Sequence, residues 1–226
     1  MAIPKFTLAL KSINAINDST EVGNDEPYLL VIGVDFTNVN ALVIDTTRYG
    51  PFSLAKSETA TTFSMPFGTP AAVYDSMDTL PGVVRRPFWG LNSRMPTPIA
   101  DIHKMAFVMI MMENDDGDPQ HIRDLVHGAA LNALVKLTNN PAGPSPNSLV
   151  ASHFRRAVVD AVNKLRSSGA FDGGLNNDDF VEMQEFLIDE QNFAPPRMGR
   201  RDLAPPLTFF KDTEGFFAVT VEMAFS

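Results

Sequence analysis

The sequence predicts a single α+β domain, mainly β, in which an antiparallel β-sandwich carries a helical segment inserted before its C-terminal strands. Three observations predict this class. Apolar runs of strand length dominate the first half of the chain. Between residues 118 and 192 the apolar residues recur at helical spacing. Period-two alternation then returns from Phe217 to Phe225.

The chain of 226 residues has the size of one large domain, so residues 1–226 are assigned to a single unit. Residues 1–117 and 203–226 are predicted to form the β-sandwich, and residues 118–192 the helical insertion. A C-terminal strand pair is weakly stable on its own. We therefore expect it to pair with the N-terminal strands.

Four strands are predicted in the first half. Phe6 to Leu10 alternates apolar and polar residues, and Tyr28 to Phe36 and Lys104 to Met112 are nearly continuous apolar runs. Asn40 to Thr46 is a weaker strand pattern. The stretch from Tyr49 to Pro98 is rich in Pro, Gly, Ser and Thr, and it predicts short strands joined by long loops.

The first predicted helix starts at Asp118-Pro119, an N-cap oxygen followed by a proline at the first helical position. It ends near Asn139, before the helix-breaking run N-P-A-G-P-S-P.

Neighbouring residues on a strand face opposite sides, so Met111 and Met112 cannot share a face. At least one of them is expected to contact the inserted helices.

Two further helices are predicted. The second is capped by Asn147 or Ser148 and ends at Gly169. The third runs from Asp178 to about Glu190, on the helical spacing of its apolar residues.

The segment after the helices is predicted to be a linker followed by a hairpin. Pro195 to Pro206 contains several prolines and arginines and is interpreted as the linker. Leu207 to Phe210 and Phe217 to Phe225 flank the turn K-D-T-E-G and form the hairpin.

Composition excludes several classes of function. The net charge of −9 argues against nucleic acid as a partner and against unaided binding to an anionic membrane. A bound cation reverses the charge locally, so a membrane surface stays open as a partner.

The absence of cysteine excludes disulfides, thiolate catalysis and Cys-ligated metals. No signal peptide or membrane span is recognised, which predicts a cytoplasmic location; export without a leader stays open.

Two acidic clusters follow or precede apolar strands. Asp25 and Glu26 stand before the second predicted strand, and Glu113, Asp115 and Asp116 stand after the fourth. Carboxylates on neighbouring loops are the oxygen ligands that Ca²⁺ prefers. The sequence therefore offers these five residues as ligands of a divalent cation. The alternative is that both clusters are solvated turns, the second lying at a helix N-terminus.

The first half of the chain resembles the C-two domains, the calcium-dependent lipid-binding β-sandwiches. The run Gly23 to Tyr28 is similar to that family's Gly-x-Ser-Asp-Pro-Tyr turn, and Pro87-Phe88-Trp89 to its Asn-Pro-x-Trp. The strand Phe107 to Met112 with the acidic run after it is similar to the family's third loop. The resemblance covers roughly residues 6 to 118. It implies a sandwich that binds Ca²⁺ and lipid, with Asp25 or Glu26 in place of the first-loop aspartate.

The chain departs from the family in four respects, the first being that its first loop has lost part of the usual acidic complement. Its third loop has Glu113 and Asp115 at the i, i+2 positions, where the family has two aspartates. The helical segment is not part of the common domain, and no basic lipid-binding strand is evident. Trp89, the tryptophan of the Pro87-Phe88-Trp89 motif, is interpreted from the sequence itself as a core anchor.

These observations predict a non-enzymatic binding module. The sequence contains no His-Glu-x-x-His, Gly-x-Ser-x-Gly, P-loop or dinucleotide fingerprint. The expected partner is a protein or a membrane surface, docked through the cation site. The alternative is an assembly subunit that oligomerises without a metal. Arg155, Arg156, Lys164 and Arg166 make one side of the second helix basic, which suits an acidic partner, another copy of the chain, or a solvated face.

Overall fold

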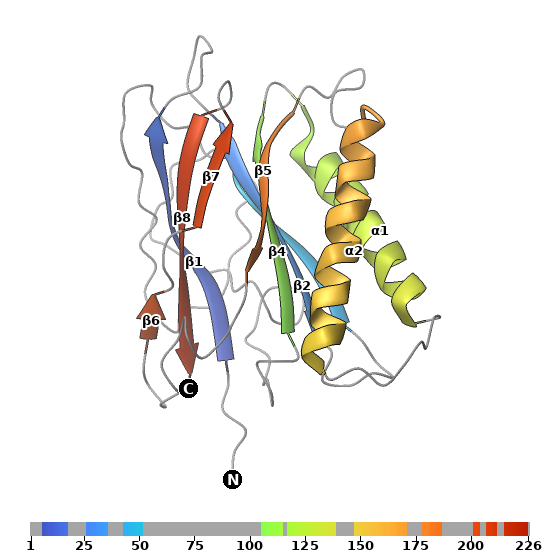
Figure 1. The fold of residues 1–226 in the computed structure, drawn as a ribbon. Helices are drawn as coiled ribbons and strands as arrows, with labels where there is room; N and C mark the ends of the chain where they lie inside the picture. The colour runs from blue at the N-terminus through green and yellow to red at the C-terminus, as the bar shows by residue number, and fades with distance from the viewer. Residues whose placement is uncertain are drawn as a thin grey trace.

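The computed structural model describes residues 6–17, 26–35, 43–51, 105–114, 117–138, 147–170, 178–186, 201–203, 207–211 and 215–225. Within these ranges the chain forms two four-stranded antiparallel sheets and two helices (Figure 1). The predicted α+β class is confirmed.

One sheet joins the two ends of the chain. It contains β1 (Phe6–Asn17), β6 (Arg201–Leu203), β7 (Leu207–Lys211) and β8 (Gly215–Phe225), in the order β1-β8-β6 with β7 also paired to β8. β1 and β8 pair from Phe6 opposite Phe225 to Asn17 opposite Phe216. The prediction that the C-terminal strands pair with the N-terminus is confirmed, whereas β6 lies in the predicted linker and was missed.

The other sheet has the order β3-β2-β4-β5, from β3 (Val43–Tyr49), β2 (Pro27–Asp35), β4 (Met105–Glu113) and β5 (Asp179–Phe186). Its two central strands, β2 and β4, are buried on both faces. This explains their nearly continuous apolar sequences, because a strand that is covered on both sides has no polar face to alternate.

The third predicted helix, Asp178 to Glu190, is wrong, since Asp179–Phe186 is strand β5. The pairing of β5 with β4 shifts register between Met111 and Met112. This irregularity places Phe180 and Met183, three residues apart, against the same apolar cluster. A bulged strand can therefore show the i, i+3 spacing that normally indicates a helix.

The helices α1 (Pro119–Thr138) and α2 (Asn147–Ser167) match their predicted positions. Asp118 caps α1, because its Oδ1 accepts a hydrogen bond from the backbone N–H of Gln120 at 3.0 Å. α2 is closed by Gly169, whose positive φ of 71° is the left-handed conformation common after a helix end. The local start and stop signals therefore act as the sequence predicts.

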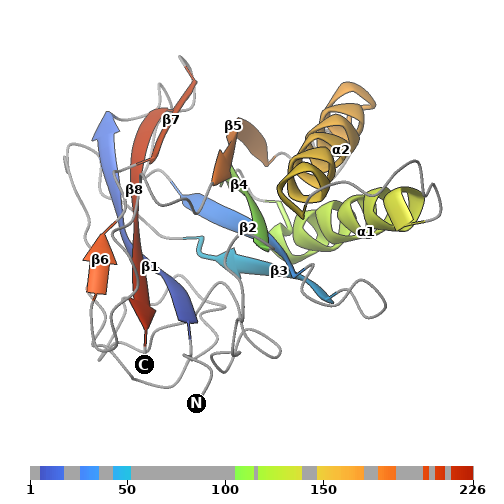
Figure 2. The ribbon, with the colours of Figure 1, turned by 60° about the horizontal axis from the view of Figure 1, so that its bottom comes forward.

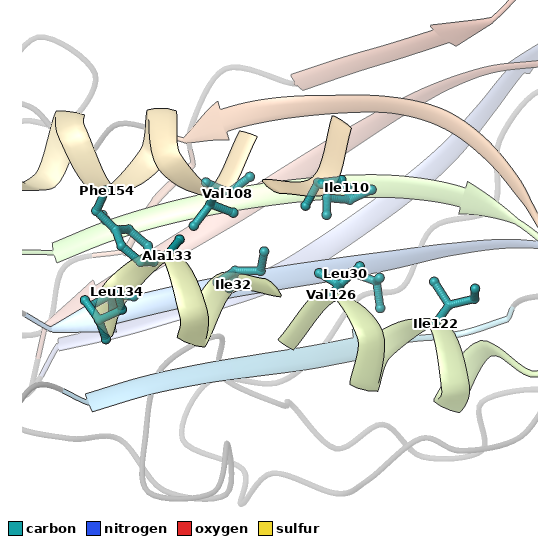
Figure 3. Packing of buried hydrophobic residues seen from close by; sticks show 14 of the residues in the cluster. Leu30, Ile32, Val108, Ile110, Ile122, Val126, Ala133, Leu134 and Phe154 are labelled. Atoms are coloured by element: carbon teal, nitrogen blue, oxygen red, sulfur yellow. The ribbon is translucent and has the colours of Figure 1, made fainter. Parts of the chain in front are cut away.

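Both helices cover the same face of the β3-β2-β4-β5 sheet, and the sheet of β1 and β8 lies on its other side (Figure 2). Side chains from α1, α2, β2 and β4 form one apolar cluster beneath the helices (Figure 3). Met112 belongs to this cluster, and Met111 is buried on the opposite face. The prediction that one of the two methionines contacts the helices is confirmed.

Polar contacts fix each helix on the sheet. Thr46 of β3 bonds to α1 twice: its Oγ1 lies 3.1 Å from His127 Nδ1, and its backbone oxygen accepts from Arg123 Nε at 2.8 Å. Arg155 of α2 reaches Glu185 of β5 at 2.9 Å. Arg155, one of the basic residues predicted on one side of this helix, therefore forms an ion pair within the protein.

Candidate functional site

The two acidic clusters begin at the same edge of the sheet. β2 and β4 pair with Pro27 opposite Glu113, so Glu26 and Asn114 stand side by side just beyond the strands. The backbone N–H of Asn114 donates to the carbonyl oxygen of Glu26 at 3.2 Å. Residues 88 positions apart in sequence are thereby neighbours. Two acidic clusters can share a cation only if the fold brings them together, and Glu26 and Asn114 meet that condition.

The two described carboxylates of the predicted site also hold the strand ends together. Glu113 is 2% exposed, and its Oε1 accepts a hydrogen bond from the backbone N–H of Glu26 at 2.9 Å. Glu26 Oε2 accepts from Asn114 Nδ2 at 2.9 Å. One oxygen of each carboxylate is therefore engaged in a hydrogen bond. Asp25, Asp115 and Asp116, the other three predicted ligands, lie outside the described residues.

A third carboxylate, Asp178, is buried beneath this edge. It precedes β5, is 0% exposed, and its Oδ2 accepts a hydrogen bond from the Tyr28 hydroxyl at 2.6 Å. Its Oδ1 accepts no hydrogen bond of ordinary geometry from a described residue. A buried carboxylate satisfied on one side only is costly, which marks this position as unusual within the core.

Burial raises the pKa of Asp178 above its ordinary value, and the charge of Asp118 adds to this effect. The Tyr28 hydroxyl, the Gly117 backbone amide and the Arg48 guanidinium act in the opposite direction and lower the pKa. Desolvation is the largest influence, so the ionised carboxylate is the disfavoured form relative to water.

Tyr28 and Arg48 complete the buried group. Burial, followed by the charge of Asp178, raises the pKa of Tyr28, so its hydroxyl remains a neutral donor at physiological pH. Arg48 is 9% exposed, and its guanidinium donates to the carbonyl oxygen of Gly50. Tyr28, Arg48, Glu113 and Asp178 thus come from four different segments; we call them the buried polar cluster.

The fit to a metal ion is partial within the described part of the chain. No group of three or more His, Asp or Glu residues there is arranged to hold a metal. Glu26 and Glu113 alone make an incomplete ligand set, because Ca²⁺ takes six to eight oxygens. Further carboxylates would have to come from the undescribed members of the same two loops.

Sequence reasoning found Glu113 but missed the other three members of the buried polar cluster. Asp178 was predicted to be the first residue of a helix, and no spacing rule singles out Tyr28 or Arg48. The only available signal was the acidic pair Asp178-Asp179 directly before the apolar pair Phe180 and Val181. Trp89, interpreted as a core anchor, lies outside the described residues.

A second candidate site is the groove between the outer sides of α1 and α2, with a volume of about 890 Å³. Its floor consists mainly of small or apolar residues, and charged residues lie along its rim. The floor residues are Leu125, Gly128, Ala129, Ala133, Leu137, Ala157, Ala161 and Leu165; the rim includes Asp124, Lys136, Asp160 and Lys164. We call this feature the helix groove.

Two exposed apolar side chains adjoin the helix groove. Leu131 is 42% exposed and Val135 is 47% exposed, each on α1. They follow the groove residues Gly128 and Asn132 by three positions, which places them on the neighbouring helix surface. Large contiguous apolar patches on a protein surface are where contact sites for other molecules occur, so this surface is a candidate for one.

Of the helices in the described ranges, none combines the length and apolar character needed to cross a bilayer. Comparison with known proteins gives no match: no family model, no curated protein and no solved structure is similar to this chain at a significant level.

Proposed function

We propose that this chain is a non-enzymatic binding module of the C-two type, which holds a divalent cation at its acidic edge and docks there to a membrane surface or a protein. The observation that supports it is that Glu26 and Glu113, one from each acidic cluster, are joined by a hydrogen bond, and that Asn114 bonds to Glu26 beside them. Asp25, Asp115 and Asp116 belong to the same two loops. Together these five residues would supply the oxygen ligands of Ca²⁺.

The β-sandwich is part of the same proposal. Leu29, Val31 and Met109 are fully buried on the face of their sheet turned away from the helices. Phe217 and Val219 are buried on β8 of the other sheet. The Gln184 side chain of β5 donates to the carbonyl oxygen of Thr208 in β7, linking the sheets at one edge. Two sheets that bury apolar faces against one another are the family's scaffold.

A cation would also explain how an acidic protein approaches an acidic surface. The net charge of −9 opposes contact with anionic lipid. A bound divalent ion is a large local charge, and it can bridge the carboxylates to lipid phosphates.

Calcium is expected to raise the thermal unfolding temperature. With about 1 mM Ca²⁺ and a dissociation constant near 10⁻⁴ M, the native state gains about 1.4 kcal/mol. For a chain of this length that corresponds to roughly 3 °C. The measurement is calorimetry of the protein in Ca²⁺ and in chelator. The variant Asp115→Asn should lose the rise in unfolding temperature that Ca²⁺ produces.

Asp160→Asn, an exposed carboxylate on α2, is the matched control and should keep the full calcium shift. Phosphatidylserine vesicles should then pull down the wild-type protein only when Ca²⁺ is present. A wild-type protein whose unfolding temperature ignores Ca²⁺ would eliminate the cation site.

A second function, an assembly subunit that oligomerises without a metal, is favoured by a different observation. The helix groove and the exposed Leu131 and Val135 lie on α1 and α2, whereas the acidic edge lies at the ends of β2 and β4. The two functions can therefore be tested separately.

A further inference from the structure

Two side-chain oxygens at the acidic edge are buried and accept no hydrogen bond of ordinary geometry from a described residue. They are Asn114 Oδ1 and Asp178 Oδ1. A buried acceptor without a donor costs free energy, because it has given up its hydrogen bonds to water. A positive group bound between these two oxygens would remove that cost.

The strand register places the two residues side by side. Asn114 directly follows β4, and Asp178 directly precedes β5. The adjoining strand ends, Glu113 and Asp179, are register partners, so the next pair outward is Asn114 and Asp178. Glu26 lies on the other side of Asn114, whose backbone N–H donates to its carbonyl oxygen at 3.2 Å. We call these three neighbours, Glu26, Asn114 and Asp178, the oxygen row.

The oxygen row lies on the face of the sheet that α1 and α2 cover. Tyr28, Met112 and Phe180, two positions further into the same strands, belong to the apolar cluster beneath the helices. Residues two positions apart on a strand share a face. The hydrogen bond from the Tyr28 hydroxyl to Asp178 agrees with this placement, because Tyr28 is itself part of the cluster.

The side-chain amide of Asn114 is oriented by Glu26. Its Nδ2 donates to Glu26 Oε2 at 2.9 Å, so Oδ1 is directed away from Glu26. Asp178 is the neighbour on that other side. Two oxygens that face the same space repel one another unless a positive group lies between them.

The carboxylate of Asp178 is held in place through its other oxygen. Tyr28 donates its hydroxyl to Oδ2 at 2.6 Å, which fixes the orientation of the group and leaves Oδ1 available. The backbone amide of Gly117 also lies near and lowers the pKa of Asp178. A carboxylate has about four acceptor positions, so these two contacts do not use its full capacity.

The charges around the oxygen row favour a cation. Asp118 is close enough to Asp178 for its charge to raise the pKa of that residue, and Arg48 is close enough to lower it. The Arg48 guanidinium donates to the carbonyl oxygen of Gly50. With Glu26 included, carboxylates outnumber guanidinium groups among the described residues of this region.

We propose that Asn114 Oδ1 and Asp178 Oδ1 are ligands of the divalent cation, and that Asp178 forms the buried end of its site. This inference rests on the proposed cation function and adds to it a residue from outside both acidic clusters. A Ca²⁺ ion about 2.4 Å from each oxygen fits between side chains whose Cβ atoms are about 5 Å apart. Every donor is an oxygen, which is the ligand that a hard cation such as Ca²⁺ prefers.

The oxygen row also offers the ion an approach and further ligands. Glu26 and Asn114 are half-buried, so they lead from the surface to the fully buried Asp178. Asp115 and Asp116 follow Asn114 directly in the sequence, and they would supply oxygens toward the roughly six to eight that Ca²⁺ takes.

The first test is isothermal titration calorimetry of the full chain with calcium chloride. Asp178→Asn should weaken calcium binding about tenfold or more, because a charged ligand becomes neutral. The Tyr28 hydroxyl then bonds to the amide oxygen, and the amide nitrogen, which is no cation ligand, takes the position of Oδ1. In chelator this variant should unfold at a temperature no lower than the wild-type protein, because a buried charge is removed. Asp160→Asn, an exposed carboxylate on α2, is the matched control and should bind calcium as the wild-type protein does.

The second test uses a variant with the opposite expected sign. Asn114→Asp keeps an oxygen directed toward Asp178 and makes it charged, so it should bind Ca²⁺ several-fold more tightly. In chelator the same variant should unfold at a lower temperature, because its carboxylate loses the hydrogen bond to Glu26 and repels it. Asn163→Asp, exposed on α2, adds the same charge elsewhere and should leave the calcium affinity unchanged. Weaker calcium binding by Asn114→Asp would show that this side chain serves the fold alone, against the proposal.

The outcomes separate this inference from the function on which it rests. If the wild-type and Asp178→Asn proteins bind calcium equally, the cation site stands at the two acidic clusters and Asp178 is not part of it. A wild-type protein that binds no calcium overturns both the cation site and the two ligands assigned to it.

Discussion

Replacing Phe154 by alanine is expected to lower the free energy of unfolding by about 3–5 kcal/mol, the usual cost of removing a large aromatic side chain from a core. Phe154 is 0% exposed and lies between α2 and the rest of the apolar cluster, near Val108 and Ala133 (Figure 3). It is the aromatic side chain that α2 contributes to the cluster. Its removal leaves a cavity between the helix and the sheet.

The measurement is urea unfolding followed by circular dichroism. Arg156→Ala, two residues further along α2 and exposed, is the matched control and should change stability by less than about 0.5 kcal/mol. Hydrogen exchange adds a spatial readout, because the amides of α2 should lose more protection than those of β1 and β8. A loss below about 1 kcal/mol would mean that α2 is not anchored through Phe154.

Elements with one uninterrupted period were predictable from sequence. α1 and α2 carry both an apolar stripe and local end signals, Asp118 and Gly169, that need no knowledge of the fold. β5 failed because its register shift against β4 imitates helical spacing at Phe180 and Met183. β6, with three residues, is too short for any period to be recognised.

Only those residues of the candidate site that lie at the ends of recognised strands could be predicted from the sequence. Glu26 and Glu113 were paired in the prediction because each borders a recognised strand, and the register of β2 on β4 does bring them together. Asp178 and Arg48 reach Tyr28 through the strand order β3-β2-β4-β5. Strand order is a non-local property that no spacing within one segment encodes.

Tyr28→Phe is expected to cost about 1–3 kcal/mol at neutral pH, the penalty for leaving a buried acceptor without its hydrogen bond. The hydroxyl that it removes donates to Asp178 Oδ2 at 2.6 Å. Asp178 is fully buried, so water does not replace the lost donor. Urea unfolding measures the change, and phenylalanine keeps the ring packing, so the effect reports the hydroxyl alone.

Asp178→Asn provides the comparison, because the amide keeps the shape of the side chain but carries no charge. In the double variant Tyr28→Phe with Asp178→Asn, the loss of the hydroxyl should cost less than in the wild-type background. Additive changes would show that Tyr28 and Asp178 are not coupled, against the hydrogen bond between them.

The sign of the pH dependence follows from the direction of the Asp178 pKa. Because the folded-state pKa is raised above its ordinary value of 3.8, the folded protein keeps a proton that the unfolded chain releases. The favourable contribution of protonated Asp178 is therefore complete below about pH 4, and it is lost as the pH rises through the folded-state pKa. Relative to Asp178→Asn, the wild-type protein should lose stability over this window.

Tyr28→Phe should make this dependence larger. The Tyr28 hydrogen bond lowers the pKa of Asp178, so its removal raises that pKa further and extends the window upward. The cost of Tyr28→Phe should consequently be small when Asp178 is protonated and should grow as Asp178 ionises. Unfolding curves collected from about pH 4 to 8 give the comparison. If wild-type and Asp178→Asn proteins show parallel pH profiles, the carboxylate is not destabilised by burial in the folded state.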